Sequence, residues 1–418
     1  MREVWVDGSE ASVHELADAL AGALAGAGTV LPLDAHDPQA GSVRAAMRPG
    51  EPVEDATTAI VPTSGSTGPA KGVLLSAHAL TSSARATHAR LGGPGRWLLA
   101  TPAHYIGGIQ VLVRSLLAGT RPAVLDLSAG FRPDEFAAAA RPVLRGTGPR
   151  YTSLVPTQLT RILDAGGPAL EAARAFDAIV VGGAATPAPL RRRAADAGLT
   201  VVSAYGMSET ASGCVYDGTP LEGVGVHLEP YGDGAGEGGD GDTSSDAACD
   251  TGGVPGRIAL SGDVLAHGYR ADPTATSAAF SGGRFHTSDL GRFRADGRLD
   301  VLGRADDVVN TGGVKVPPAL VERALLDHPG VDQACAVGIP DAEWGEIVVA
   351  AIVPTDPAGP PASEALAELA RAAGGRTAVP KRIHVLDSFP ELGPGKVDRS
   401  ALRSTLTRPA GTGRERRA

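Results

Sequence analysis

The residues whose types and spacing most clearly suggest chemistry form the loop "TSGSTGPAKG" at 63–72. This loop combines hydroxyl side chains, glycines and one lysine. Apolar residues at 59–61 and 73–75 indicate that one strand enters the loop and another leaves it. Glycine lets the backbone approach a ligand closely, and successive amides and hydroxyls form a concavity that suits phosphate oxygens. The Walker pattern G-x-x-x-x-G-K-[ST] is not met, because Ala70 and Gly72 stand at two of its required positions. The loop predicts a phosphate site of another type, although a Gly/Ser surface turn is the more common origin of such a composition taken alone.

Lysine is scarce in this chain, so each lysine is a candidate for a functional role. Of the 38 basic residues only four are lysines, namely Lys71, Lys315, Lys381 and Lys396. A lysine kept where arginine is the rule indicates a need for a compact ammonium charge that a guanidinium does not replace. Lys71 and Lys396 both lie in glycine-containing loops, "GPAKG" and "GPGKVD", where neither a helix nor a salt bridge explains them.

The bulk properties exclude several classes of protein. A chain of 418 residues with 43% hydrophobic and 20% charged residues predicts a soluble globular protein of two or more domains. The formal net charge of −9 argues against general nucleic-acid binding, and three scattered cysteines indicate neither a disulfide framework nor a zinc site. The N-terminus has no apolar signal-peptide core, and polar residues interrupt the apolar region 97–119, so we expect no membrane span and a cytoplasmic location.

Strand-like and helix-like segments alternate up to about residue 206, as in the predicted helix 109–119 and the predicted strand 176–183. This alternation predicts an α/β fold with helix-covered parallel sheets, which bind ligands at the carboxyl ends of the strands. From about residue 221, shorter strands separated by turns predict a small antiparallel barrel-like subdomain. A small mobile α+β unit is expected to follow. We predict an N-terminal domain at 1–304, a C-terminal domain at 305–406 and a disordered tail at 407–418.

Residues 230–253 almost lack bulky apolar side chains, so we expect a flexible insertion there. The "GDGD" within it lacks the repeat and the terminal glutamate of an EF-hand loop, which argues against a calcium site.

Five motifs, in a fixed order, resemble those of the adenylate-forming enzymes, the superfamily of acyl-CoA synthetases, peptide-synthetase adenylation domains and luciferases. The resemblance runs from about residue 55 to 405, and five ordered motifs are far more specific than any one. Ser208 stands where the family has threonine and keeps the hydroxyl, whereas Ser288 replaces a glycine. The motifs are "TSGSTGPAKGV", "YGMSET" (205–210), "HTSDLG" (286–291), "GRADDVVNTGGVKVPPALVE" and "GPGKVDR" (393–399).

The resemblance implies that a carboxylate attacks the α-phosphate of ATP, with Mg²⁺ as the metal and CoA as the second substrate. The residues implied for the β- and γ-phosphates are Ser64, Gly65, Ser66, Thr67, Gly68 and Lys71. Those implied for the α-phosphate, the adenine and the ribose are Ser208, Tyr205, Gly206, Gly183, Ala184, Asp289 and Arg304. Glu209 would hold Mg²⁺, and Lys396 would bridge the carboxylate and the α-phosphate.

The resemblance also implies a moving C-terminal domain. Asp306 falls at the hinge about which that domain would turn between the two half-reactions. Gly312 and Gly313, with Lys315 nearby, would then pass the pantetheine arm of CoA. The resemblance is compatible with a homodimer.

The choice of carboxylate rests on a narrower resemblance. Only about 55 residues precede the phosphate loop, and this short form, with 101–120 and 151–163, resembles actinobacterial o-succinylbenzoate–CoA ligases of menaquinone biosynthesis. The implied substrate is an aromatic dicarboxylate whose second carboxylate must be paired, because a buried unpaired charge is prohibitive. The implied pocket residues are His104, which is also a catalytic candidate, Tyr105, Ser153, Thr157 and Gly182.

Other interpretations stay open at this point. Taken alone, Glu209 and Asp289 are more simply solvated loop carboxylates, and His104 a core or capping histidine. A non-catalytic adenylate-binding relative would need neither Glu209 nor Lys396. An acyl- or aryl-CoA ligase of another carboxylate fits the motifs, as does an enzyme that loads a carrier protein. No carrier-like serine motif follows residue 405, which favours CoA.

Overall fold

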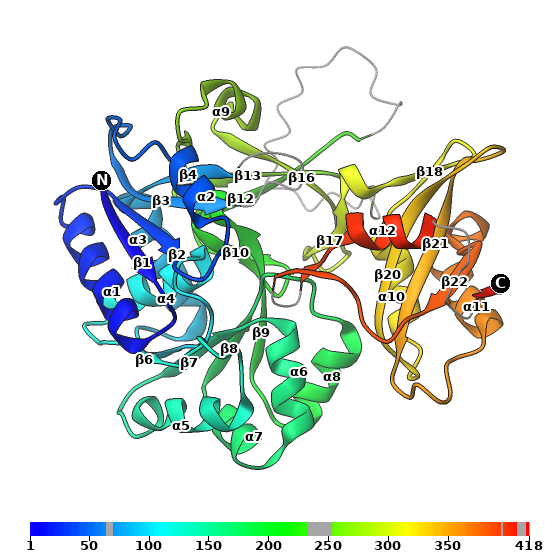
Figure 1. The fold of residues 1–418 in the computed structure, drawn as a ribbon, viewed down its shortest axis with the longest axis horizontal. Helices are drawn as coiled ribbons and strands as arrows, with labels where there is room; N and C mark the ends of the chain where they lie inside the picture. The colour runs from blue at the N-terminus through cyan, green and yellow to red at the C-terminus, as the bar shows by residue number, and fades with distance from the viewer. Residues whose placement is uncertain (64–69, 232–252, 254, 394–395, 408–414, 418) are drawn as a thin grey trace. The chain divides into compact units, whose positions relative to one another are not determined.

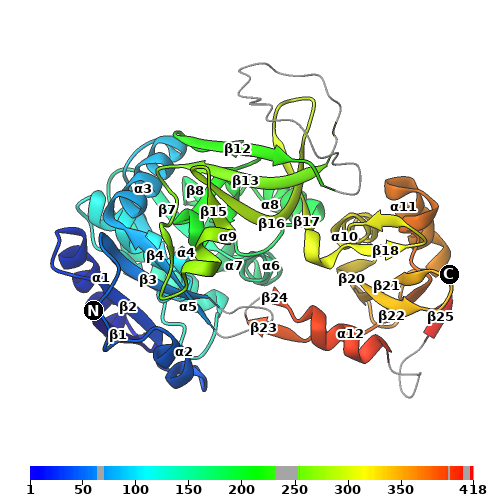
Figure 2. The ribbon, with the colours of Figure 1, turned by 90° about the horizontal axis from the view of Figure 1, so that it is seen from above.

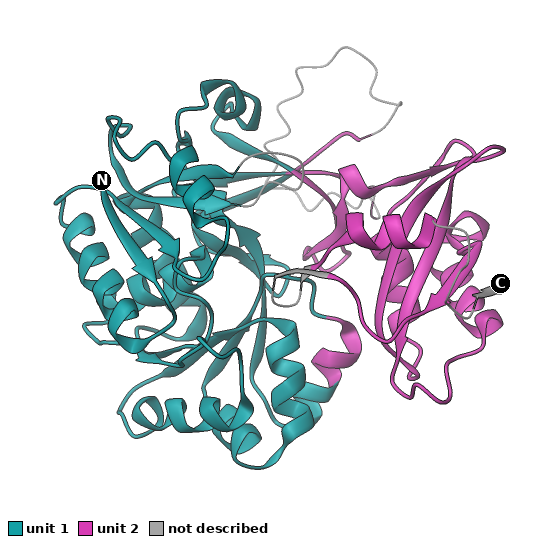
Figure 3. Cartoon of the chain, viewed as in Figure 1, with its two compact units in different colours: residues 1–186, 193–227, 259–287 teal, residues 187–192, 228–258, 288–418 magenta. Residues whose placement is uncertain are grey.

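The computed structural model describes residues 1–63, 70–231, 253, 255–393, 396–407 and 415–417 (Figure 1). The chain divides into two compact units (Figure 3). Unit 1 comprises Met1–Thr186, Arg193–His227 and Ala259–Thr287, and unit 2 comprises Pro187–Arg192, Leu228–Ile258 and Ser288–Ala418. The domain boundary predicted after residue 304 stays a prediction.

The first sheet of unit 1 has five strands and includes the two that flank the phosphate loop. In sheet order, the first three strands run parallel to one another. The fourth strand pairs antiparallel with the third, and the fifth pairs antiparallel with the fourth. In sheet order the strands are β1 (Arg2–Val6), β2 (Val30–Asp34), β3 (Thr57–Thr63), β4 (Lys71–Ser76) and β14 (Gly268–Tyr269). The accompanying helices are α1 (Glu10–Leu24), α2 (Ala40–Ala46), α3 (Ala77–Leu91) and α9 (Pro273–Ala279).

The second sheet of unit 1 confirms the predicted alternation of strands and helices. Five parallel strands form its main part, and two antiparallel strands extend one edge. The strands are, in sheet order, β11 (Thr219–Pro220), β10 (Ser212–Tyr216), β9 (Val201–Met207), β8 (Ala178–Val181), β7 (Arg150–Leu154), β5 (Arg96–Leu99) and β6 (Ala123–Val124). The helices that alternate with them are α4 (Ile106–Leu117), α5 (Pro133–Leu144), α6 (Pro156–Ala165), α7 (Gly167–Arg174) and α8 (Ala188–Asp196).

The predicted antiparallel region is a third sheet, and Figure 2 shows its strands β12, β13 and β16 next to one another. Its strands are β12 (Val224–Glu229), β13 (Gly256–Gly262), β16 (Arg284–Phe293), β15 (Phe280–Ser281) and, paired with β16, β17 (Leu299–Arg304). Most of the insertion predicted at 230–253 lies outside the described residues. A Cβ on Gly256 would lie 2.7 Å from the carbonyl oxygen of Glu229, so the two strands that flank this segment are close neighbours.

Unit 2 contains the predicted small α+β region. One sheet carries apolar clusters on its two faces, one with α10 and α11 and the other with α12. Its strands are β18 (Val309–Thr311), β19 (Val314–Val316), β20 (Val331–Asp341), β21 (Gly345–Pro354), β22 (Arg382–Val385) and β25 (Glu415–Arg417). The helices are α10 (Pro318–Leu326), α11 (Ser363–Gly374) and α12 (Arg399–Thr407), and a hairpin joins β23 (Glu391–Gly393) to β24 (Lys396–Val397).

Within the predicted tail, residues 415–417 form β25, which pairs antiparallel with β22, and the predicted disorder of 407–418 stays a prediction. Short single-turn helices η1 (Ser208–Thr210), η2 (Ala305–Asp307) and η3 (Arg376–Ala378) complete the fold. The α/β class predicted from the sequence is confirmed. Within the described residues, no helix has both the length and the apolar character that crossing a bilayer requires.

Candidate active site

The residues predicted to contact the acyl substrate gather at one edge of the second sheet. Parallel strands β5, β7 and β8 place Leu99 beside Ser153 and Ser153 beside Val180, so the three strands end together. The chain then continues into the loop of His104, the first turn of α6 with Thr157, and Gly182. The amide of Gly182 donates to the carbonyl oxygen of Leu154 at 3.1 Å, which fixes the start of its loop.

His104 has a neighbour that the sequence analysis missed. Its Nε2 lies 3.7 Å from Oδ2 of Asp34, which ends β2 of the first sheet, whereas His104 lies in the loop that follows β5 of the second sheet. The other oxygen of Asp34 accepts a hydrogen bond from the amide of His36 at 2.9 Å, which orients the carboxylate. Burial lowers the pKa of His104, and the charges of Asp34 and Asp37 partly oppose that shift. The net shift favours the neutral imidazole.

The predicted phosphate loop begins and ends on paired strands. Thr63 at the end of β3 pairs with Lys71 at the start of β4, and the Thr63 hydroxyl donates to the Lys71 carbonyl oxygen at 3.3 Å. This pairing fixes the backbone of Lys71. The predicted residues Ser64, Gly65, Ser66, Thr67 and Gly68 lie outside the described residues.

The "YGMSET" segment runs from β9 into η1. Tyr205 is half-buried on β9, and Ser208 is buried in η1. The hydroxyl of Thr210 accepts a hydrogen bond from the amide of Met207 at 3.0 Å and so closes the turn that holds Glu209. Gly206 cannot carry a side chain, because a Cβ there would overlap the carbonyl oxygen of Ser212 on β10.

A tyrosine connects the predicted phosphate lysine to the predicted metal carboxylate. The hydroxyl of Tyr269 on β14 donates to Oε1 of Glu209 at 2.9 Å. Nζ of Lys71 lies 5.0 Å from the centroid of the Tyr269 ring, within the range of a cation–π contact. The structure therefore brings Lys71 and Glu209, 138 positions apart in the sequence, to the same side chain.

Unit 2 carries the residues predicted for the ribose and the hinge. Asp289 on β16 and Arg304 on β17 are cross-strand partners, so the two ribose candidates lie side by side. Nη2 of Arg304 also lies 2.8 Å from Oδ2 of Asp306 in η2, which links the ribose candidate to the hinge candidate. Lys396 is the first residue of β24, and its backbone pairs with Gly393.

The residues predicted for CoA form the β18–β19 hairpin of unit 2. Gly312 and Gly313 make its turn with φ of +58° and +81°, a left-handed conformation that favours glycine. A Cβ on Gly312 would also lie 2.7 Å from Cε3 of Trp344. Nζ of Lys315, two residues further on, lies 5.4 Å from the centroid of the Tyr231 ring.

Comparison with known proteins shows the family to which this chain belongs. Residues 6–270 match the AMP-binding enzyme family, and residues 320–396 match the C-terminal domain of AMP-binding enzymes. The chain is 46% identical over 365 residues to a probable 2-succinylbenzoate–CoA ligase of Mycobacterium tuberculosis, covering 86% of this chain and 88% of that protein. This chain belongs to the AMP-binding enzyme family.

Solved structures of relatives extend the comparison to ligands. The O-succinylbenzoate coenzyme A synthetase of Bacillus subtilis, in complex with its acyl-adenylate intermediate, superposes with a TM-score of 0.70 at 25% identity. The match covers 96% of this AMP-binding enzyme and 82% of that chain. The same synthetase with ATP and a magnesium ion gives a TM-score of 0.68 at 27% identity, covering 84% and 70% of the two chains.

The residues of this AMP-binding enzyme suit a magnesium ion bound together with ATP. Among the described residues, no three His, Cys, Asp or Glu side chains gather into a cage for a metal ion. Mg²⁺ needs no such cage, since it takes one or two carboxylates and completes its shell with phosphate oxygens and water. Glu209 supplies a carboxylate for the metal, and the Lys71 ammonium, which contacts the same tyrosine, supplies a positive charge for phosphate oxygens.

Sequence reasoning missed Tyr269 and Asp34 at this site. The sequence around Tyr269, "HGYRADPTAT", does contain a helix-start pattern. Asp272 caps α9 with its side chain, and Pro273 begins that helix. That pattern predicts a tight strand-to-helix turn but not which loop the turn faces. Asp34 carries no motif, and its contact with His104 appears only once the two sheets are packed.

Proposed function

We propose that this AMP-binding enzyme joins 2-succinylbenzoate to CoA, converting 2-succinylbenzoate, ATP and CoA into 2-succinylbenzoyl-CoA, AMP and pyrophosphate. The observation that carries the proposal is the 46% identity to a probable 2-succinylbenzoate–CoA ligase over most of both chains. The Bacillus subtilis synthetase in complex with its acyl-adenylate supports a reaction through that intermediate.

In the first half-reaction, an oxygen of the succinyl carboxylate attacks the α-phosphorus of ATP, and pyrophosphate leaves. Negative charge spreads over the phosphoryl oxygens, so catalysis consists mainly of positioning and electrostatic stabilisation. Lys71 neutralises charge on the β- and γ-phosphates, Ser208 donates to the α-phosphate, and Lys396 bridges the attacking carboxylate and the α-phosphate. Glu209 would hold a magnesium ion, which would neutralise further charge on the phosphates.

In the second half-reaction, the CoA thiolate attacks the acyl carbon of the adenylate, and AMP leaves. We assign this step to a second orientation of the domain 305–406, reached by rotation at Asp306. Lys396 then leaves the reacting atoms. The Trp344 ring packs against Gly312, whereas Gly313 has open space where a side chain would stand, which suits passage of the narrow pantetheine arm on that side of the turn.

The second carboxylate of the substrate requires a polar partner in the acyl pocket. His104, Tyr105, Ser153 and Thr157 provide such groups near the carboxyl edge of the second sheet. Tyr105 is 50% exposed and packs its ring 4.2 Å from the His104 ring, centroid to centroid, so it is the member of the set most open to a ligand. Because ATP and CoA are cytoplasmic, we place the enzyme in the cytoplasm.

The test is pyrophosphate release across a panel of carboxylates, followed by mass detection of the CoA thioester. We expect CoA-, ATP- and Mg²⁺-dependent turnover of 2-succinylbenzoate, and no turnover of benzoate or long-chain fatty acids. Equal or better turnover of a fatty acid would overturn the substrate and leave the family intact. Pyrophosphate release without any CoA thioester would favour the loading of a carrier protein instead.

A further inference from the structure

Tyr269, in unit 1, contacts two charged residues of the proposed site. Glu209 is the proposed magnesium ligand, and Lys71 is the proposed phosphate-binding residue. Tyr269 donates to the Glu209 carboxylate through its hydroxyl and carries the Lys71 ammonium over its ring face. Lys71 forms no ion pair within 4.0 Å with any residue that the structure describes. The aromatic ring is therefore the side chain on which the Lys71 ammonium rests, while the carboxylate binds at the far end of the same ring.

The Tyr269 side chain is held in place from several directions. The residue is 7% exposed, and its amide donates to the hydroxyl of Thr276 at 2.9 Å. The ring of Phe280 meets the Tyr269 ring edge-on, with centroids 5.7 Å apart. On the neighbouring strand β4, Val73 is its register partner, which places Tyr269 next to the strand that Lys71 begins.

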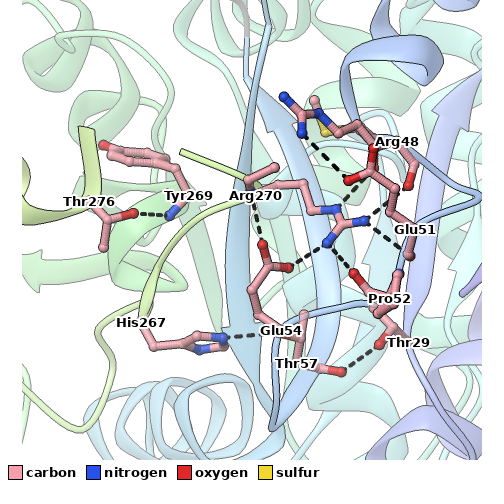
Figure 4. A network of polar contacts seen from close by, with 12 residues as sticks. Thr29, Arg48, Glu51, Pro52, Glu54, Thr57, His267, Tyr269, Arg270 and Thr276 are labelled. Atoms are coloured by element: carbon pink, nitrogen blue, oxygen red, sulfur yellow. Dashed lines mark hydrogen bonds and ion pairs between the residues drawn. The ribbon is translucent and has the colours of Figure 1, made fainter. Parts of the chain in front are cut away.

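The strand that carries Tyr269 is anchored by the next residue, Arg270. Its side chain is 2% exposed, and Figure 4 shows the guanidinium surrounded by the chain that leads into β3. The guanidinium pairs with the Glu54 carboxylate at 2.8 Å, and a second oxygen of that carboxylate accepts from the amide of Ala271 at 2.9 Å. The carbonyl oxygens that accept from it belong to Met47, Arg48, Glu51 and Pro52.

A second contact near this anchor holds the same strand. The amide of Ala266 donates to the carbonyl oxygen of Glu209 at 2.8 Å, so the chain leading into β14 also fixes the backbone of the carboxylate residue. The imidazole of His267 bonds the Thr57 hydroxyl at 2.9 Å (Figure 4). The backbone that carries Tyr269 is thus fixed by several contacts, and its side chain reaches the Lys71 ammonium and the Glu209 carboxylate.

We propose that Tyr269 is a positioning residue that holds the Lys71 ammonium and the Glu209 carboxylate in place and keeps them from pairing with each other. The inference rests on the proposed function. Opposite charges within about 4 Å form a direct ion pair. Such a pair would withdraw the carboxylate from magnesium and the ammonium from phosphate. The ring prevents this by offering the ammonium its face and the carboxylate its hydroxyl.

The experiment measures nucleotide binding by calorimetry on the full chain, with and without magnesium. Tyr269→Phe removes the hydroxyl and keeps the ring. We expect the magnesium concentration that gives half-maximal enhancement of ATP binding to rise about tenfold, as for loss of a hydrogen bond to a charged acceptor. ATP affinity in EDTA should stay within about twofold of the wild type. Tyr269→Leu, which also removes the ring face, should weaken ATP binding in EDTA as well.

The matched control is Tyr151→Phe in the second sheet. The Tyr151 hydroxyl donates to the carbonyl oxygens of Leu91 and Gly93 at 2.9 and 3.1 Å, so this variant also loses a buried tyrosine hydrogen bond. It should lower the melting temperature and leave the magnesium dependence unchanged. In a Glu209→Gln background, Tyr269→Phe should produce no further change in magnesium dependence.

Three results would overturn the inference. One is an unchanged magnesium dependence in a folded Tyr269→Phe protein, and another is an equal shift in Tyr151→Phe. The third is a full additional shift in the Glu209→Gln background, because Tyr269 would then not act through Glu209. A wild-type protein that binds no magnesium–ATP at all would overturn the proposed function and this inference with it.

Discussion

At the scale of single residues, the two loop lysines are proposed to serve different stages of one reaction. Lys71 is anchored by strand pairing at the start of β4 and rests on a buried tyrosine. Lys396 begins a two-residue strand in a hairpin of unit 2. A lysine on a fixed support suits a binding role throughout the cycle, whereas the proposed rotation of residues 305–406 would bring Lys396 to the phosphate for one step only.

We predict that Lys396→Ala separates the half-reactions. Adenylate formation should fall several hundredfold or more, comparable to the loss of a charged transition-state contact of roughly 3–4 kcal/mol. Thioester formation from pre-formed acyl-adenylate should proceed at a near-normal rate. Single-turnover assays of the two steps measure both.

Lys71→Ala provides the comparison, since its loss should appear partly as a raised KM for ATP. An equally severe block of thioester formation in Lys396→Ala would rule out the alternating-domain assignment for this chain.

At the scale of elements, helices α3 and α4 bury polar side chains against the second sheet. This buried polar seam consists of His88 of α3 and Arg114 of α4. Arg114 of α4 is 2% exposed and lies over the Trp97 ring at 5.1 Å from its centroid. Its Nη2 donates to the Tyr216 hydroxyl at 3.4 Å, and no carboxylate pairs with it among the described residues. His88 of α3 is also buried, and its Nε2 has no hydrogen-bond partner in the part of the chain that is described.

This seam predicts a destabilisation in acid. Burial, and secondarily the Arg114 charge, lower the pKa of His88 from 6.5 to about 4. Between these two values the unfolded chain binds the proton and the folded chain does not, so stability falls as the pH drops from about 6.5 to about 4, by on the order of 2–3 kcal/mol in full. In thermal unfolding, His88→Phe should therefore lose less melting temperature across this window than the wild type.

The control for that measurement lies on the same helix. His78 of α3 has a side chain that is 67% exposed, so His78→Phe should keep the wild-type pH profile. Parallel profiles for His88→Phe and the wild type would contradict the prediction.

The elements differ in how well the sequence predicts them. Segments with a clear apolar pattern were predictable from the sequence. One example is β13 at 256–262, where the pattern "GRIALSG" indicates a strand. The two-residue strand β14 was not predictable, because it has no period and exists only through its pairing with β4, almost 200 positions earlier. Motifs identified Lys71 and Glu209 as candidates, but Tyr269 joins them through that same long-range pairing. Local pattern carries no information on such contacts.

At the scale of the whole molecule, the segment of low apolar content between β12 and β13 is expected to be dispensable. Glu229 and Gly256, at the strand ends that flank it, are already neighbours. Deleting residues 231–252 and joining the flanks with a short turn should leave turnover within a few-fold, since closing a surface loop costs little whatever its length. Steady-state assays of the deletion variant measure this. A hundredfold loss would show that the segment contributes to the site.

The Arg270 anchor has a consequence for how the chain is made. The carboxylate of Glu54 meets its guanidinium partner 216 positions later in the sequence. At about 5–20 residues per second, a ribosome delivers that partner about 10–40 s after Glu54 has been synthesised. Throughout this interval β4 lacks its β14 neighbour and presents an open hydrogen-bonding edge, which is the kind of surface that recruits other strands. We therefore expect the edge of the nascent first sheet to be open to pairing with other strands until β14 has been synthesised.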